Sequence, residues 1–311
     1  MEIILSAVLL LIGLVMLCFG GNWLVSGGVT IAKKFRISNL VIGMTIVAYG
    51  TSTPELAASI AAAGDHSAII LGNVIGSNIA NVGMVIGVAA ILTPLVIQKS
   101  ILRKEIPIML GVSALLVLLS IDGELSQYDG ILLLIGLGIF AVYTFRSALK
   151  QREKSKDDTN SGKNNVYLKS IGLMGIGIIL LYIGAILTVD NAVVIASEFG
   201  LSETIIGLTV IAIGTSLPEL ITSIIAIRKG HTDIGIGNII GSNIYNILMI
   251  MGVGAALGGV LITADVYVDY AIMIIFSISL LIGLKTHIIK KPMGIILATG
   301  YILYLITTFF K

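Results

Sequence analysis

Charge, proline and cysteine are all scarce in this sequence. Only 12% of its 311 residues are charged, whereas an average soluble chain has about 25%. With 57% hydrophobic residues and a mean hydropathy of +1.07, a water-soluble domain of this size cannot hide its apolar surface. Disorder is excluded because disordered chains have low hydrophobicity, whereas the hydrophobicity of this chain is high. The single Cys18 excludes an intrachain disulfide and a cysteine-based metal cluster.

The remaining class is an all-α polytopic membrane protein. The net charge of +2 is too small to indicate a nucleic-acid partner. Because the composition is so apolar, the expected surrounding is the lipid bilayer. A transmembrane barrel would need strands of alternating polarity, whereas the apolar runs here are continuous. A membrane-spanning helix needs roughly 20 apolar residues. We predict ten spans, at about 3–32, 37–63, 67–97, 106–121, 129–146, 168–190, 204–227, 234–262, 269–285 and 292–310.

The basic residues predict the orientation of these spans. With ten spans, 18 of the 19 basic residues fall in one set of alternate loops, and only Lys311 lies opposite. Because basic loops are cytoplasmic, both termini are expected outside. The 18 are Lys33, Lys34, Arg36, Lys99, Arg103, Lys104, Arg146, Lys150, Arg152, Lys154, Lys156, Lys163, Lys169, Arg228, Lys229, Lys285, Lys290 and Lys291.

One polar stretch, residues 150–165, divides the chain, and we predict that it is a flexible cytoplasmic linker. It separates a first five-helix repeat, 1–149, from a second, 166–311. Residues 42–55 (IGMTIVAYGTSTPE) and 206–219 (IGLTVIAIGTSLPE) share nine of fourteen residues, and residues 72–82 (GNVIGSNIANV) and 237–247 (GNIIGSNIYNI) share eight of eleven. Because five is odd, the second repeat is inverted in the membrane, a construction typical of secondary transporters.

Two acidic residues lie within predicted spans at equivalent positions of the repeats, Glu55 and Glu219. A carboxylate inside a bilayer costs several kcal/mol and marks a functional site. Neither span contains a Lys, Arg or His to pair with it. If the two meet across the repeat axis, they repel each other unless one is protonated or a cation lies between them. The structural alternative is a protonated carboxyl bonded to a neighbouring helix.

A proline precedes each of these acids. Pro54 and Pro218 remove a backbone donor and clash with the carbonyl four residues earlier, at Gly50 or Gly214, so we predict a broken helix at membrane depth. The carbonyls of neighbouring residues are expected to be freed as well. With the Ser52 and Ser216 hydroxyls and the two carboxylates, they form an all-oxygen cage suited to hard cations such as Ca²⁺ and Na⁺. The residues with predicted free carbonyls are Ala48, Thr51, Ala212 and Thr215.

The third and eighth spans supply a second wall of polar residues. Ser77 and Asn81, like Ser242 and Asn246, are four residues apart and share one helix face. For these four we favour cation ligation. For the other asparagines of these spans we favour hydrogen bonds between helices, with nearby glycines allowing close approach. Those asparagines are Asn73, Asn78, Asn238 and Asn243, and the glycines are Gly72, Gly76, Gly237 and Gly241.

These motifs resemble the cation/Ca²⁺ exchanger superfamily, most closely its prokaryotic sodium/calcium exchanger branch. The resemblance rests on GTSTPE at 50–55 with 72–81, and on GTSLPE at 214–219 with 237–246, and the ten-span plan extends it over the whole chain. It implies ten helices, four ion sites near the midplane, and a tilted first and sixth helix that slide against the core. One departure is Asn246, where several exchangers carry an acid, so the cavity holds two fixed negative charges.

The resemblance also implies which residues hold each ion. Glu55 and Glu219 with the carbonyls of Thr51 and Thr215 would hold Ca²⁺. The other sites are expected as follows: an outer Na⁺ site of Ser77, Ser216, Glu55 and the Ala212 carbonyl, an inner Na⁺ site of Ser242, Ser52, Glu219 and the Ala48 carbonyl, and a middle position lined by Asn81 and Asn246.

The expected function is Na⁺/Ca²⁺ antiport, without a cofactor, with Ca²⁺ and Na⁺ as substrates. The rivals are H⁺/Ca²⁺ exchange or a K⁺-dependent mode through the same site, and a cation channel. An intramembrane enzyme is disfavoured because no His or Lys stands beside Ser52 or Ser216 to activate a hydroxyl. The compact size and the lack of a targeting segment favour a prokaryotic inner membrane, and no obligate protein partner is evident.

Overall fold

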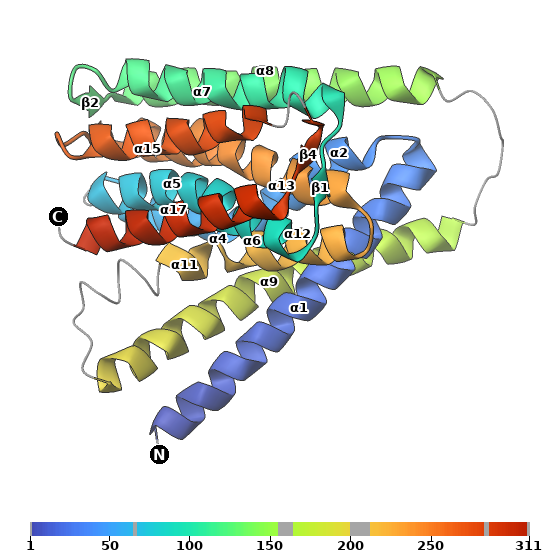
Figure 1. Ribbon diagram of the computed structural model, residues 1–311, viewed down its shortest axis with the longest axis horizontal. Coiled ribbons are helices and arrows are strands. Elements are labelled where there is room, and N and C mark those ends of the chain that lie inside the picture. Colours follow the sequence, from blue (N-terminus) through green and yellow to red (C-terminus); the bar gives the residue numbers. More distant parts are fainter. Residues whose placement is uncertain (1, 65–66, 155–163, 200–211, 283–285, 310–311) are drawn as a thin grey trace.

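Nearly all of the chain is helical. The computed structural model describes residues 2–64, 67–154, 164–199, 212–282 and 286–309 (Figure 1). Six described helices are long and apolar enough to cross a membrane: Ile3–Phe35, Ser67–Leu92, Gln127–Lys150, Leu168–Glu198, Thr232–Gly258 and Lys291–Thr308. Shorter apolar helices lie at Asn39–Thr51 and Val266–Ile282. The expectation of a helical membrane protein is confirmed.

Helices α1 (Glu2–Phe35) and α9 (Asn164–Glu198) form a pair that lies diagonally below the other helices in Figure 1. They contain 34 and 35 residues, so each is about 50 Å long at 1.5 Å per residue. The hydrocarbon core of a bilayer is only about 30 Å thick. Helices of this length must tilt to keep their apolar surface in the membrane.

Glycines allow α1 and α9 to touch backbone to backbone. A Cβ on Gly20 would lie 2.8 Å from the Gly177 carbonyl, and one on Gly13 would lie 2.9 Å from the Gly184 carbonyl. Further along, Gly27 meets α9 at Met174. The contacts move forward along α1 as they move backward along α9. The first helices of the two repeats therefore run antiparallel, as an inverted repeat requires.

The second span is broken into pieces, and so is the described part of its repeat. The first consists of α2 (Asn39–Ile42), the π-helix η1 (Gly43–Val47), α3 (Ala48–Thr51) and α4 (Thr53–Ala62). Its counterpart contains α11 (Ala212–Thr215) and α12 (Leu217–Arg228). The predicted seventh span begins at 204, so its first part lies outside the described residues.

The third and eighth spans form the centre of the molecule. One consists of α5 (Ser67–Ala80), the π-helix η2 (Asn81–Ile86) and α6 (Gly87–Leu92). The other consists of α13 (Thr232–Tyr245), the π-helix η5 (Asn246–Met251) and α14 (Gly252–Gly258). In the most apolar 18 residues of each central span, 83% of the residues are buried, against 17–33% for the other long described helices. Polar residues on these two spans are therefore shielded from lipid.

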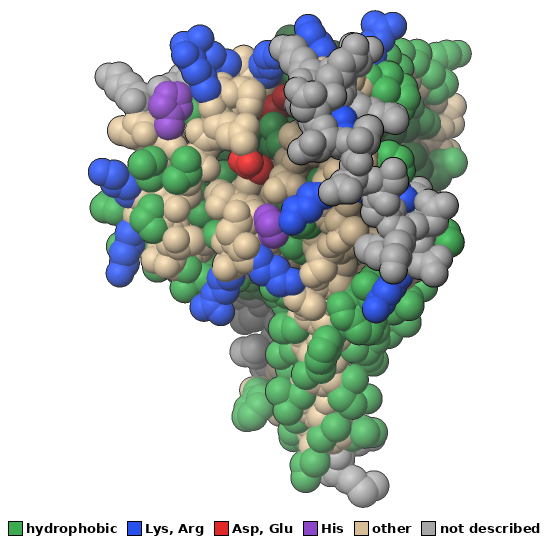
Figure 2. Space-filling view, turned by 90° about the vertical axis from the view of Figure 1, so that its right-hand side faces the viewer, with side chains coloured by type: hydrophobic (Ala, Val, Ile, Leu, Met, Phe, Trp, Pro, Cys, Tyr) green, Lys and Arg blue, Asp and Glu red, His purple; other side chains and the backbone are tan. Residues whose placement is uncertain are grey.

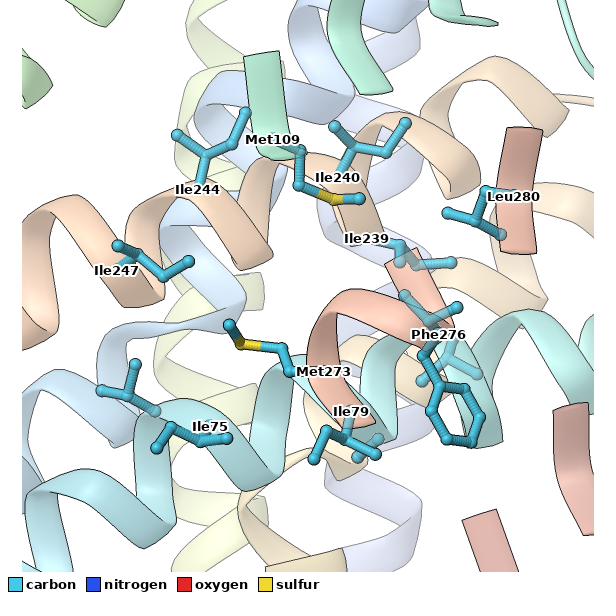
Figure 3. Packing of buried hydrophobic residues seen from close by; sticks show 14 of the residues in the cluster. Ile75, Ile79, Met109, Ile239, Ile240, Ile244, Ile247, Met273, Phe276 and Leu280 are labelled. Atoms are coloured by element: carbon cyan, nitrogen blue, oxygen red, sulfur yellow. The ribbon is translucent and has the colours of Figure 1, made fainter. Parts of the chain in front are cut away.

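The remaining helices surround this centre. They are the π-helix η3 (Ile101–Glu105), α7 (Ile106–Leu119), α8 (Gln127–Lys154), α15 (Val266–Ser279), the 3₁₀ turn η6 (Leu280–Ile282) and α17 (Lys291–Phe309). Figure 3 shows their apolar packing, in which Met109 of α7 and Met273 of α15 lie among isoleucines of α5 and α13. Because both methionines are fully buried, this packing holds the two central spans in place.

Two very short antiparallel sheets, which were not predicted, join loops of opposite repeats. Strand β1 (Leu95–Val96) pairs with β4 (Ile288–Ile289), and β2 (Glu124–Leu125) pairs with β3 (Val260–Leu261). Each sheet thus takes one strand from each half of the chain. The two pairings are related by the repeat offset, so they are equivalent connections at the two ends of the helices.

The positions of the chain ends and of the basic residues agree with the predicted arrangement. Both termini lie toward one end of the molecule, while α8 ends and α9 begins toward the other (Figure 1). Lys and Arg side chains gather around this second end (Figure 2). Helices cover both margins of the predicted linker, and its middle, residues 155–163, lies outside the described residues. The exact count of ten spans and the orientation in a membrane stay predictions.

Candidate functional site

Both repeats break their second span at the same serine. Ser52 has φ −84° and ψ 8°, and Ser216 has φ −89° and ψ 4°, so each separates two short helices. The following prolines stand in the first turn of α4 and α12, where a missing N–H costs little. The carbonyl oxygen of Gly50, four residues before Pro54, receives no helical hydrogen bond from that position because proline has no N–H. The predicted breaks are confirmed.

The two acids meet at these breaks. Glu55 and Glu219 lie in the first turns of α4 and α12, are each 1% exposed, and have carboxyl groups that are direct neighbours. The positive end of each half-helix favours a carboxylate at this place. Two adjacent carboxylates in a water-poor interior repel each other strongly. The pair therefore requires a cation or a proton, as the sequence indicates.

Two serines from opposite repeats converge on Glu219. The Ser52 hydroxyl donates to Glu219 Oε1 at 3.1 Å, and the Ser242 hydroxyl donates to the same oxygen at 3.5 Å. The structure thus brings together the three side chains predicted for the inner Na⁺ site. The equivalent hydroxyls, on Ser216 and Ser77, have no hydrogen-bond partner among the described residues.

Several other buried oxygens of the predicted site also lack a partner. One oxygen of each carboxylate and the side-chain oxygens of Asn81 and Asn246 are enclosed without a donor within the described part of the chain. Buried polar atoms in native proteins are nearly always paired, so each such oxygen needs an explanation. The glutamate and asparagine oxygens of this set repeat between the two halves, whereas the two serines do not: the set is Glu55 Oε2, Glu219 Oε2, Asn81 Oδ1, Asn246 Oδ1, Ser77 Oγ and Ser216 Oγ.

Asparagines on the central spans link the two repeats. Asn81 Nδ2 donates to Asn243 Oδ1 at 2.9 Å, and Asn246 Nδ2 donates to Asn78 Oδ1 at 3.0 Å. The expected hydrogen bonding of Asn78 and Asn243 between helices is confirmed. Asn81 and Asn246 combine the two interpretations, since the amide nitrogen bonds the other repeat and the oxygen stays available to a ligand.

The outer asparagines of these spans fix the broken helices. Asn73 donates to the Glu55 carbonyl and to Ser59, each at 2.9 Å, and Asn238 donates to Ser223 at 3.0 Å. Their predicted structural role is confirmed. Because Asn73 bonds the Glu55 backbone itself, it helps to set the position of that carboxylate.

The predicted close approach at the glycines is confirmed for the eighth span. Added Cβ atoms on Gly237 and Gly241 would fall within 2.8 Å of atoms in α2, η1 and α3. An added Cβ on Gly72 or on Gly76 would meet no described atom within 4 Å. The segment equivalent to the contacted one is 204–212, of which 204–211 lie outside the described residues, so the prediction there is untested.

The prediction of a free Ala48 carbonyl is wrong. This oxygen accepts from the Ser52 N–H at 3.0 Å and from the Thr51 hydroxyl at 3.2 Å, because the helix stays intact up to Thr51. In the second repeat the Ser216 N–H donates to the Ile213 carbonyl at 3.1 Å, one residue closer than the Ala212 carbonyl. Thr51 is fully buried, while Thr215 is partly exposed. The two breaks are therefore similar but not identical.

Two glycines place both breaks against α9. A Cβ on Gly50 would lie 2.8 Å from the Ile178 side chain, and one on Gly214 would lie 2.2 Å from that of Val189. Only glycine allows this approach without displacing a neighbour. The long tilted helix thus contacts both halves of the site directly.

The site is built from oxygen atoms alone. Among the described residues no group of three or more His, Cys, Asp and Glu side chains lies together, so two carboxylates carry all of its formal charge. Hydroxyl, amide and carboxylate oxygens are the ligands of hard cations, and Ca²⁺ takes 6–8 of them. The arrangement can bind dehydrated metal ions at the boundary between two inverted repeats.

A helical membrane protein with two inverted repeats and a buried acidic site between broken helices belongs to the class of secondary transporters. A sequence model of the sodium/calcium exchanger protein family matches residues 5–146 and again 169–310. The chain belongs to this family.

Relatives and a solved structure match almost the whole chain. "Inner membrane protein YrbG" of Escherichia coli is 36% identical over 97% of this chain and 96% of its own. "Sodium/calcium exchanger MaX1" of Methanosarcina acetivorans is 34% identical over 97% and 98%. The crystal structure of the sodium-calcium exchanger NCX_Mj, soaked with Na⁺ and without Ca²⁺, is 35% identical, with a TM-score of 0.86 over 98% of this chain and 99% of that one. The similarity therefore extends over both repeats.

Proposed function

We propose that this protein exchanges Na⁺ for Ca²⁺ across a membrane. The observation that carries the proposal is the adjacent pair Glu55 and Glu219, buried together and surrounded by oxygens that lack a partner among the described residues. One Ca²⁺ neutralises two carboxylates, whereas several Na⁺ ions bring a net positive charge. Family membership and the sodium/calcium exchangers among the relatives support the same reaction.

Each ion would occupy its own part of the cavity. Ca²⁺ would lie between the two carboxylates, with the Thr51 and Thr215 carbonyls. The inner Na⁺ site would use Ser52, Ser242 and Glu219, whose side chains already touch. The outer Na⁺ site would use Ser77, Ser216, Glu55 and the Ala212 carbonyl, and its two hydroxyls have no hydrogen-bond partner within the described ranges. Asn81 and Asn246 would line a middle position.

Exchange would proceed by alternating access. The α1 and α9 pair contacts both helix breaks, at Gly50 and Gly214, and lies to one side of the other helices (Figure 1), so it is the element best placed to slide. Either ion load neutralises the carboxylates and lets the cavity pass an apolar barrier. The empty cavity holds two adjacent negative charges, which oppose this step. Exchange is thereby favoured over leak.

The remaining parts of the proposal concern location and reaction type. Both termini would face outside and the central linker the cytoplasm, in a prokaryotic inner membrane. The protein would be a transporter and not an enzyme, because the sequence has no His or Lys beside Ser52 or Ser216 to activate a hydroxyl. The two repeats would be 1–149 and 166–311, consistent with the separate family matches to each half.

Uptake of ⁴⁵Ca²⁺ into Na⁺-loaded proteoliposomes tests the proposal. Wild-type protein should accumulate Ca²⁺ only when Na⁺ is inside, and Glu55→Gln or Glu219→Gln should abolish uptake. Asp190→Asn is a matched control, because Asp190 is another acid at a predicted span but is exposed, outside the cavity. Continued uptake by either glutamine variant would contradict the proposal.

The same vesicles separate the rival ions. Uptake under a pH gradient without Na⁺ would indicate H⁺/Ca²⁺ exchange, and uptake that needs added K⁺ would indicate a K⁺-dependent mode. Ca²⁺ entry without any internal counter-ion would indicate a channel. Each of these outcomes would replace Na⁺/Ca²⁺ antiport as the function.

A further inference from the structure

We infer that Asn78 and Asn243 are positioning residues that turn the Asn81 and Asn246 amide oxygens toward the ions. The inference rests on the proposed function, because it assigns the orientation of two ligands in the same cavity. Neither residue is among the predicted ligands. All four asparagines are buried, with an exposure of 1% each.

The first chain of hydrogen bonds starts at a backbone carbonyl. Asn243 Nδ2 faces the Asn78 carbonyl oxygen at 3.5 Å and the Met109 sulfur, also at 3.5 Å. A carbonyl and a thioether can only accept, so the amide must turn its N–H groups toward them. Asn243 Oδ1 then faces Asn81, which donates to it at 2.9 Å. The Asn81 oxygen is left pointing away, and it has no partner among the described residues.

A second chain repeats this order with the halves exchanged. Asn78 Nδ2 faces the Asn243 carbonyl at 3.3 Å and the Met273 sulfur at 3.7 Å. Its oxygen accepts from Asn246 Nδ2 at 3.0 Å, and Asn246 Oδ1 is the second amide oxygen without a partner in the described chain. Met109 and Met273 both project into the packed centre between the two repeats (Figure 3).

The two chains are independent because each begins at main-chain and sulfur acceptors. Replacing the Asn78 side chain leaves its carbonyl, so the chain that ends at Asn81 is kept. The same holds for Asn243 and the chain that ends at Asn246. Each chain crosses from one repeat to the other and back.

The orientation decides what the middle position can bind. An amide presents either an acceptor oxygen or two N–H donors, and donors would repel a metal ion. With both oxygens turned inward, the position attracts a cation, or a water molecule that donates its hydrogens. An unconstrained amide would lose this selectivity by rotating about its last bond.

A double-mutant cycle tests the inference. Leucine has nearly the shape of asparagine without its hydrogen-bonding groups, so Asn243→Leu frees the Asn81 amide. We expect the Na⁺ affinity, measured by equilibrium ²²Na⁺ binding to purified protein, to fall about tenfold, the effect of about 1.4 kcal/mol. Asn81→Ala should lower the affinity by itself. Adding Asn243→Leu to Asn81→Ala should cause no further loss, since no amide remains to be oriented.

The crossed pairs are matched controls. The same substitutions combined as Asn243→Leu with Asn246→Ala, or as Asn78→Leu with Asn81→Ala, should be additive, because these pairs belong to different chains. The pair of Asn78→Leu and Asn246→Ala should be non-additive. Additive effects in all four pairs would show that Asn78 and Asn243 serve packing alone, and would overturn the inference.

Folding and function are monitored separately. Size-exclusion chromatography and the melting temperature without ions report folding, and Asn243→Ala and Asn78→Ala replace a leucine variant that fails to fold. If wild-type protein binds ²²Na⁺ but does not exchange it for Ca²⁺, the proposed function fails while the cycle still decides the inference. If it binds no Na⁺, both are overturned.

Discussion

Serine hydroxyls at the two helix breaks have different partners despite their equivalent positions. Ser52 donates to Glu219 at 3.1 Å, whereas Ser216 has no partner in the described part of the chain. We expect Ser52→Ala to destabilise the ion-free protein by about 2 kcal/mol, since it removes a donor from a buried carboxyl. Ser216→Ala should leave stability unchanged or raise it.

Melting temperatures in Na⁺-free and Ca²⁺-free buffer measure this difference. Both variants should bind Na⁺ more weakly, because each loses a proposed ligand. Equal destabilisation by the two substitutions would contradict the asymmetry between the breaks.

A third buried acid lies outside the proposed ion site. Glu105, at the end of η3, is 6% exposed, accepts from the Tyr143 hydroxyl at 3.2 Å, and keeps its other oxygen without a described partner. Burial raises the pKa of Glu105 above its ordinary value of 4.5. The folded state therefore holds the proton more tightly than the unfolded state, and stability falls as the pH rises above 4.5.

Glu105→Gln removes this pH dependence. We expect the variant to melt higher than the wild-type protein at neutral pH, and the gap to close as the pH falls toward 4.5. Thermal melts across this range measure the gap. A gap that stays constant with pH would show that Glu105 does not titrate on unfolding.

Sequence reasoning identified the candidate ligands but not the hydrogen bonds that their side chains make. Glu55 and Glu219 stand out because acids are rare inside membrane spans and these two repeat. Glu105 gave no such signal, because its hydrogen-bond partner Tyr143 lies 38 residues away in the chain. The difference in hydrogen bonding between the Ser52 and Ser216 hydroxyls also has no local signal, since both serines occur in the same GTS motif.

At the scale of helices, the contact between α1 and α9 depends on glycine. An added Cβ on Gly177 would lie 2.9 Å from the Gly20 carbonyl, whereas one on Gly175 meets no described atom within 4 Å. We expect Gly177→Ala to lower the melting temperature, at a cost of about 1–3 kcal/mol for overpacking. Gly175→Ala, the matched control on the same helix, should stabilise slightly through helix propensity.

The exchange rate provides a second readout for this pair. If α1 and α9 slide together, Gly177→Ala should also slow Na⁺-dependent Ca²⁺ uptake, and Gly175→Ala should not. Equal behaviour of the two variants would show that the backbone contact has no role in stability or movement.

Some elements could be predicted and others could not. The breaks at Ser52 and Ser216 follow from the prolines, whose missing N–H has a local effect. The π-helical segments that begin at Asn81 and Asn246 have no comparable signal in the sequence. Such segments are frequent at functional sites, and here both start at a proposed ligand.

At the scale of the whole molecule, the charge distribution predicts the topology. The basic loops are expected on the cytoplasmic side, so both termini should be outside. Alkaline phosphatase fused after residue 311 should be active in a bacterial cell, and the same enzyme inserted in 155–163 should be inactive. The reverse result would contradict the predicted orientation while leaving the inverted repeat intact.

The short strands at the two ends of the helices pair between the repeats, so each half of the chain depends on the other half for these hydrogen bonds. In the described part of the chain, β1 pairs with β4 of the second repeat, and β3 pairs with β2 of the first. If the gene is cut in the linker, fragments 1–149 and 166–311 made together should co-purify and restore Ca²⁺ uptake, while either fragment alone should not. The two repeats would then assemble as two subunits do, and the linker between them would not be required for assembly.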